Sequence, residues 1–300
     1  RPARMAAGGF ACTFVAVQPT LVLEDYDAAK PILAEFVAKS KGATAIFCGW
    51  SSTRSVRASD VVGSFREGRG DRLTLRQAYP DGAAALAHLQ DVVAPTLEAL
   101  LAGPASGVSS MELHGPPPEL ERLRAAVEQT SGAPATCFAT EAGVSFMEKE
   151  AGGVPQPLQM TSVHSTFEVA DWTAVEPILA DFVERTRKNE KNGCVFSSFS
   201  RSGTTLHCRE AYGSPSAIAK HVENVAPCTE ALLSGPATLT STAIHGSQPN
   251  LKAYQDNMRQ PGVYGAELPD YFYKGSADER GFDGGFSRFE LQQSLFGFSF

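Results

Sequence analysis

The chain repeats one pattern, and this repeat constrains its fold more than any other feature of the sequence. The clearest matches are DYDAAKPILAEFVAKS (25–40) with DWTAVEPILADFVERT (171–186), and VAPTLEALLAGP (93–104) with VAPCTEALLSGP (225–236). The first copy carries an extra stretch, SVRASDVVGSFREGRG (55–70), which is typical of a surface insertion. Because 300 residues are the length of about two medium domains, we expect one copy in each half.

Within each copy, hydrophobic periodicity alternates between strands and helices in a fixed order. In the second copy, alternation at 163–169 predicts a strand, and apolar residues at helical spacing follow Asp171, a typical helix N-cap. Two strands, a second helix and a last strand then follow, at 194–200, 204–212, 216–233 and 238–246. The predicted order is β-α-β-β-α-β, that of a ferredoxin-like unit.

A four-stranded sheet with both helices on one face leaves its other face uncovered. Burial of apolar surface stabilises a protein by about 25 cal/mol per Å², so we expect the second copy to cover the first. The predicted class is α+β, with two tandem ferredoxin-like units that close on each other and a long C-terminal extension. The expected divisions are a processed N-terminal segment (1–9), the first unit (10–150), the second unit (151–262) and an aromatic, glycine-rich docking tail (263–300).

Two short motifs connect this pattern to a known family. Arg-Glu-Ala-Tyr at 209–212 precedes His221, and Arg-Gln-Ala-Tyr at 76–79 precedes His88. Together with the order of elements, they resemble the dimeric α+β barrel proteins, and among these the antibiotic-biosynthesis monooxygenase-like group. The resemblance implies an intramolecular dimeric α+β barrel. It implies less about chemistry, because one fold hosts many unrelated functions.

The same motifs supply the candidate catalytic residues. A cofactor-free oxygenase needs groups that deprotonate a phenolic substrate, and His221 is the candidate base, with Glu210 as its orienting carboxylate and Tyr212 nearby. His88 is the counterpart in the first copy, where Gln77 replaces the carboxylate. The alternative is that both histidines satisfy a polar position where a helix crosses the sheet.

The other histidines are weaker candidates. His164 and His207 lie on strands that we expect to be neighbours, and with a third group they could hold a metal. No carboxylate spacing requires this, so we expect no metal site and no bound cofactor. His114 and His245 end equivalent strands before loops, which favours a role in stabilising turns.

Charge and cysteine content exclude several classes of function. The chain has 26 basic and 33 acidic residues and a net charge of −7, which gives no general surface for nucleic acid. No apolar run approaches the length of about 20 residues that a membrane helix needs. The six cysteines have no C-x-x-C spacing, which argues against a disulfide framework or a structural zinc site.

Two segments are candidate partner-binding sites. The insertion carries Arg57, Arg66 and Arg69, which could bind an acidic partner or form a solvated hairpin. The last thirty residues hold seven of the eighteen phenylalanines, and such a segment either wraps the chain's own barrel or docks on a larger partner. The docking candidates are Phe282, Phe286, Phe289, Phe296, Phe298 and Phe300.

Two functions from different classes follow. The first is a non-catalytic accessory subunit of a larger organelle assembly, in particular a photosystem complex of a plastid, attached through the tail and peripheral to the membrane. The organelle expectation comes from RPARMAAGG (1–9), which resembles the remnant of a transit peptide. The alternative is a cofactor-independent monooxygenase-like enzyme that acts on a small phenolic or polyketide-like ligand.

Overall fold

A computed structural model describes residues 14–40, 43–53, 71–145, 161–190, 193–246 and 285–292. In the first half the elements are β1 (Val15–Leu23), α1 (Tyr26–Ser40), β2 (Phe47–Thr53), β3 (Asp71–Tyr79), α2 (Gly82–His88), the π-helix η2 (Leu89–Val93), α3 (Ala94–Leu101), β4 (Ala105–Gly115), α4 (Pro117–Ser131) and β5 (Thr136–Ser145). In the second half they are β6 (Thr161–Val169), α5 (Trp172–Asn189), β7 (Cys194–Ser202), β8 (Thr205–Tyr212), α6 (Pro215–Leu233) and β9 (Ala237–Gly246), followed by β10 (Gly285–Gln292).

The predicted order of elements is present, and the α+β class is confirmed. The local signals that predicted the second half have direct structural counterparts. The Asp171 side chain caps α5 by accepting hydrogen bonds from the Thr173 and Ala174 amides at 2.9 and 3.3 Å. Gly203 makes the turn between β7 and β8 with φ of 60°, a conformation that favours glycine.

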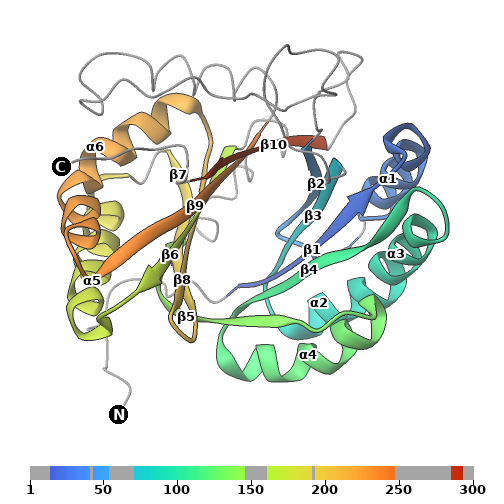
Figure 1. The fold of residues 1–300 in the computed structure, drawn as a ribbon, viewed down its shortest axis with the longest axis horizontal. Coiled ribbons are helices and arrows are strands. Elements are labelled where there is room, and N and C mark those ends of the chain that lie inside the picture. Colours follow the sequence, from blue (N-terminus) through green and yellow to red (C-terminus); the bar gives the residue numbers. More distant parts are fainter. Residues whose placement is uncertain are drawn as a thin grey trace.

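The strands form a closed barrel in the order β1-β3-β2-β10-β9-β6-β8-β7-β5-β4. We predicted two four-stranded sheets, but β5 and β10 join them as two additional strands. β5 pairs parallel with β4 and antiparallel with β7, whereas β10 pairs parallel with β2 and antiparallel with β9. In Figure 1 the helices of the two halves lie on opposite outer sides of the barrel, and β5 and β10 connect the halves.

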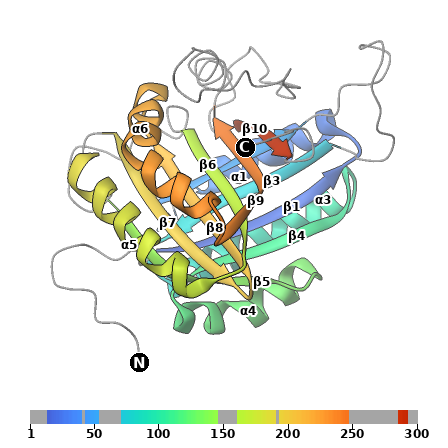
Figure 2. The ribbon, with the colours of Figure 1, turned by 60° about the vertical axis from the view of Figure 1, so that its left-hand side comes forward.

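Each half has an apolar core between its helices and the outer face of its strands. In the first half, Leu33 and Phe36 of α1 belong to the same buried cluster as Leu73 and Leu75 of β3. The second half buries the corresponding side chains of α5, β7 and β8, namely Val175, Leu179, Phe182, Phe199 and Leu206. Figure 2 shows α5 and α6 side by side over β7 and β8. Among the described residues, no helix is both long and apolar enough to span a membrane.

The inner face of the barrel differs from our expectation of an uncovered apolar face. Residues alternate along a strand, so the neighbours of core residues such as Leu75 and Cys208 point inward. Phe14, Ala78 and Phe196 belong to one small apolar cluster of this inner face. Much of the rest is polar and buried: Gln18, Thr20, Thr74, Arg76, His114, Ser162, Ser198, Ser200, Arg209 and His245. Polar side chains therefore meet inside the barrel, where we had expected apolar packing.

Candidate functional site

In the second half, a charged cluster lies between α6 and the outer face of β8. His221 Nδ1 lies 2.7 Å from Glu190 Oε2, and its Nε2 lies 2.8 Å from Glu210 Oε1. Glu190 directly follows α5, so the histidine connects the end of one helix to a strand. The structure thus brings together the predicted pair, His221 and Glu210, and adds a second carboxylate that we had not predicted.

The cluster is buried and held by further contacts. Ser197 donates a hydrogen bond to Glu210 Oε1 at 3.1 Å, and Asn224 donates one to Glu190 Oε1 at 2.5 Å. The rings of Tyr212 and Phe182 pack on His221, with centroids 5.2 and 5.3 Å from its ring. The exposed fractions of His221, Glu210 and Tyr212 are 2%, 7% and 0%. Water therefore screens these charges weakly.

The charges set the protonation state of the cluster. Burial alone would lower the pKa of His221, but Glu210 and Glu190 outweigh it and raise this pKa to about 9. Burial would raise the pKa of Glu210, but the positive charge of His221 and the hydrogen bond from Ser197 keep it below its usual value. At neutral pH, His221 is therefore an imidazolium between two carboxylates and holds a proton, where we had predicted a ready base.

The equivalent position in the first half is neutral. The Tyr79 hydroxyl contacts Gln77 Oε1 and lies 2.6 Å from His88 Nδ1, while His88 Nε2 lies 3.0 Å from Ser40 Oγ. Burial lowers the pKa of His88, and Asp91 offsets only part of this effect. His88 is buried, with 3% of its surface exposed. The two halves therefore place a histidine at the same point with opposite protonation states.

A close backbone approach positions α6 in the second half. A Cβ atom on Gly193, which precedes β7, would lie 2.7 Å from the Ala217 Cβ in the first turn of α6. Gly193 and Cys194 donate their amides to the carbonyl of Glu190 at 3.2 Å. The turn that follows α5 is thus compact, and it brings the Glu190 carboxylate under His221.

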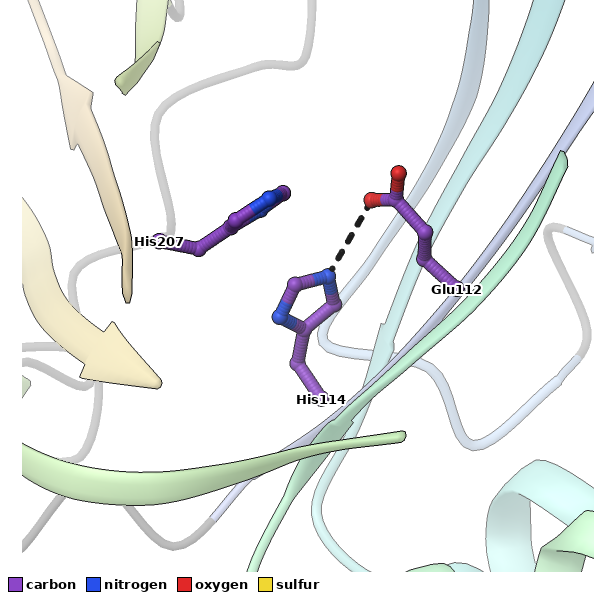
Figure 3. Close-up of side chains that lie close together, drawn as sticks. All are labelled: Glu112, His114 and His207. Atoms are coloured by element: carbon purple, nitrogen blue, oxygen red, sulfur yellow. Dashed lines mark hydrogen bonds and ion pairs between the residues drawn. The ribbon is translucent and has the colours of Figure 1, made fainter. Parts of the chain in front are cut away.

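A second cluster lies on the inner face of the barrel. Glu112 and His114 project from β4 and His207 projects from β8, and their candidate ligand atoms all lie within 4.8 Å of one another. His114 Nε2 is 3.4 Å from Glu112 Oε2, and His114 Nδ1 is 2.9 Å from Ser200 Oγ. Figure 3 shows the three side chains pointing toward one another. Our turn-stabilising interpretation of His114 did not anticipate this, because His207 belongs to the other half of the chain.

The remaining inner histidines form a separate group. The rings of His164 and His245 pack with centroids 4.9 Å apart, and His245 Nδ1 lies 2.8 Å from Ser51 Oγ. Arg76 contacts Ser162 and approaches His164 Nε2 at 3.4 Å. β6 and β8 are neighbours, as expected, but His164 packs on His245 whereas the ring of His207 packs on His114.

Three inner histidines, His114, His164 and His207, are held neutral. The pKa values of His114 and His164 are lowered well below the usual range. Burial is the largest cause of this lowering, and the positive charge of Arg209 adds to it. The pKa of His207 falls to about 4, chiefly through burial. Arg209 itself pairs in register with Ser198 of β7 and, because side chains alternate along a strand, lies on the inner face, opposite to Glu210.

Most candidate partner-binding residues lie outside the described part of the chain. This is true of Arg57, Arg66, Arg69, Phe282, Phe296, Phe298 and Phe300. Phe286 and Phe289 lie on β10, whose backbone pairs with β2 and β9. At least this portion of the tail belongs to the chain's own barrel, which was one of our two expectations for the tail. Docking on a partner stays a prediction.

Comparisons with known proteins give only remote similarities. No protein family matches the chain, and no curated protein sequence is significantly similar to it. A candidate monooxygenase from Fusobacterium nucleatum has a TM-score of 0.47 and 11% identity, over 75% of this chain and 88% of that one. A candidate monooxygenase from Lactobacillus acidophilus has a TM-score of 0.46 and 11% identity, over 77% of this chain and 91% of that one. MupZ from Pseudomonas fluorescens is 26% identical over 40% of this chain and 98% of its own, with a TM-score of 0.30. The fold assignment therefore rests on the strand order described above.

Proposed function

We propose that the chain is an enzyme whose second half carries an acid–base site, and that it oxidises a small phenolic or polyketide-like ligand without a bound cofactor. The observation that supports this proposal is the difference between the two halves. The second half buries one imidazolium and two carboxylates, while the first half fills the same position with neutral groups.

The neutral site in the first half acts as an internal reference. It shows that this fold closes around a histidine without burying charge. Removing charges from water costs several kcal/mol per ion unless the pairing is excellent, so a purely structural histidine gains little from the charged arrangement. Perturbed pKa values with specific charge partners are typical of functional sites. This comparison favours chemistry in the second half.

The pKa of about 9 suits a phenolic substrate. A phenol titrates near pH 10, so His221 and the substrate would share a proton almost evenly. His221 in its neutral form takes the phenolic proton, and the resulting imidazolium stabilises the phenolate. The phenolate supplies electrons to O2, the ring C–H carbon para to the phenolate oxygen becomes C=O, one oxygen atom enters the quinone product and the other leaves as water. No external reductant is required.

The surroundings of the cluster are mainly apolar. Tyr212, Ala217 and Ile218 form a buried group against which Val163 and Val222 pack. Because His221 and Tyr212 are buried, a ligand reaches them only after α6 moves away from the sheet. Ring stacking on Tyr212 and Phe182 would then hold a planar ligand beside His221.

Oxygen uptake with a panel of electron-rich phenols tests the proposal. We expect uptake that rises with pH with an apparent pKa of about 9. His221→Gln should remove at least 90% of the activity. Glu210→Gln should shift the profile to lower pH, because one of the two charges that raise the histidine pKa is lost. The matched control is His88→Gln, which changes the neutral site and should retain activity.

Two results would contradict this function. One is equal loss of activity in folded His221→Gln and His88→Gln proteins. The other is no oxygen uptake by the wild-type chain with any phenol in the panel. The accessory-subunit hypothesis depends on the tail, of which only residues 285–292 are described, and on a plastid location, so it stays a prediction.

A further inference from the structure

The inner face of the barrel brings together three side chains with the donor atoms of a metal site. Glu112 and His114 are two residues apart on β4 and therefore share a face, while His207 reaches them from β8. We propose that Glu112, His114 and His207 bind one divalent first-row transition metal. This proposal does not depend on the proposed function.

The distances suit a metal of this class after small movements. Ligand atoms about 2.05 Å from a tetrahedral metal lie about 3.4 Å from one another. His114 Nε2 and Glu112 Oε2 already have this separation, at 3.4 Å. The candidate ligand atoms of Glu112, His114 and His207 all lie within 4.8 Å of one another. A side-chain shift of about 1 Å would therefore bring all three atoms to the separation that a shared metal needs.

Neighbouring groups hold the two imidazoles in place. Ser200 Oγ lies 2.9 Å from His114 Nδ1, which directs Nε2 toward Glu112. Phe138 stacks on His114 with centroids 4.8 Å apart and also packs on His207 at 4.2 Å. Thr166 Oγ1 lies 3.3 Å from His207 Nε2 and restricts its rotation. Both rings are therefore oriented before any metal binds.

The donor set indicates the class of metal and the strength of binding. Two imidazoles and one carboxylate leave coordination positions open and suit Zn²⁺, Fe²⁺, Mn²⁺ or Co²⁺. Glu112 contributes one negative charge, but the nearby Arg209 repels a cation. We therefore expect affinity in the micromolar range, with the open positions available to an oxygen ligand such as a carboxylate.

The site lies on the opposite face of β8 from the charged cluster. His207 faces the barrel interior, whereas Glu210 faces α6 and His221. Binding can therefore be measured without any assay of oxygenation, and the failure of one proposal does not imply the failure of the other.

Metal binding is tested on untagged, chelator-treated full-length protein. Co²⁺ is titrated by visible absorption and Zn²⁺ by calorimetry, and we expect one ion per chain. Glu112→Gln is the preferred variant because the Glu112 side chain is 31% exposed, so that its replacement should leave the fold intact. We expect at least a tenfold loss of affinity in Glu112→Gln and His207→Gln. The matched control is His164→Gln, an inner-face histidine outside the cluster, which should bind as the wild type does.

Thermal unfolding provides a second measurement on the same proteins. A metal that binds only the folded state raises the melting temperature of the wild type and of His164→Gln, and not that of Glu112→Gln. The proposal is overturned if the wild type binds neither ion at 100 µM, a concentration of about ten or more times a micromolar Kd. It is also overturned if a folded Glu112→Gln protein binds with unchanged affinity, because the metal then has other ligands.

Discussion

At the scale of single residues, two carboxylates distinguish the charged site of the second half from the neutral site of the first half. Gln77 and Glu210 occupy equivalent positions in the two motifs, and only the second can pair with a charged histidine. The carboxylate at Glu190 then completes the ion pairing on the other ring nitrogen. Two similar local frameworks therefore hold a neutral His88 and a protonated His221.

This difference predicts a specific dependence of stability on pH. The pKa of His221 is about 9 in the folded state and near 6.5 when unfolded, so the folded protein binds more protons between these values. The free energy of unfolding should fall as pH rises from about 6.5 to 9, by on the order of 3 kcal/mol in total. Urea denaturation at a series of pH values measures it. In His221→Gln this part of the slope should disappear.

The control for this prediction is His88, whose effect on stability depends on pH in the opposite direction. The folded-state pKa of His88 is lowered, so its contribution to stability is lost as pH falls below about 6.5. His88→Gln should therefore keep the wild-type slope between pH 6.5 and 9. An unchanged slope in His221→Gln would mean that this histidine is not protonated in the folded state.

Sequence reasoning found part of this chemistry. The Arg-Glu-Ala-Tyr motif predicted that Glu210 orients His221, and the two side chains do lie together. Glu190 was missed because it lies 31 residues from His221 and no periodicity marks it. The inner cluster was missed because Glu112 and His207 come from different halves, and their approach depends on barrel closure.

At the scale of elements, β5 and β10 make the difference between two separate sheets and one barrel. Helical and strand periodicity predicted the elements of the second unit closely: the expected helix 216–233 is α6 (Pro215–Leu233). The same periodicity did not reveal β5 or β10, because their partners β7 and β2 lie far away in the sequence. Strand pairing of this kind is set by the tertiary fold.

We predict that β10 stabilises the barrel. Replacing Gly285–Gln292 by a Gly/Ser linker of the same length should lower the denaturation midpoint, because it leaves the edges of β2 and β9 unpaired. The same protein should self-associate on size-exclusion chromatography. A chain that ends at Gln292 keeps this strand and is the control. Equal midpoints for the linker variant and this control would show that β10 contributes no stability.

At the scale of the whole molecule, the two halves meet through strand edges and through polar contacts inside the barrel. Ser200 contacts His114, Ser51 contacts His245, and Arg76 contacts Ser162. Each of these pairs joins the first half to the second. The polar interior holds the halves in one register, because a shifted register would leave buried polar groups unpaired.

We therefore expect neither half to be a well-folded monomer alone. A fragment of residues 158–260 should form oligomers, since it exposes the edges that β5 and β10 cover in the intact chain. Co-expression of residues 10–150 with residues 158–292, which include β10, should restore a complex of one copy of each. Light scattering coupled to chromatography distinguishes these states. A stable monomer of the 158–260 fragment would contradict the closed barrel.

The position of β10 at the far end of the chain also has a consequence for synthesis. β2 ends at Thr53, but the strand that covers its edge begins only at Gly285. A ribosome that adds 5–20 residues per second needs about 10 to 50 s to reach it. During that time the edge of β2 lacks its final neighbour. Cells that make this protein should therefore depend on chaperones that shield an exposed strand edge until translation ends.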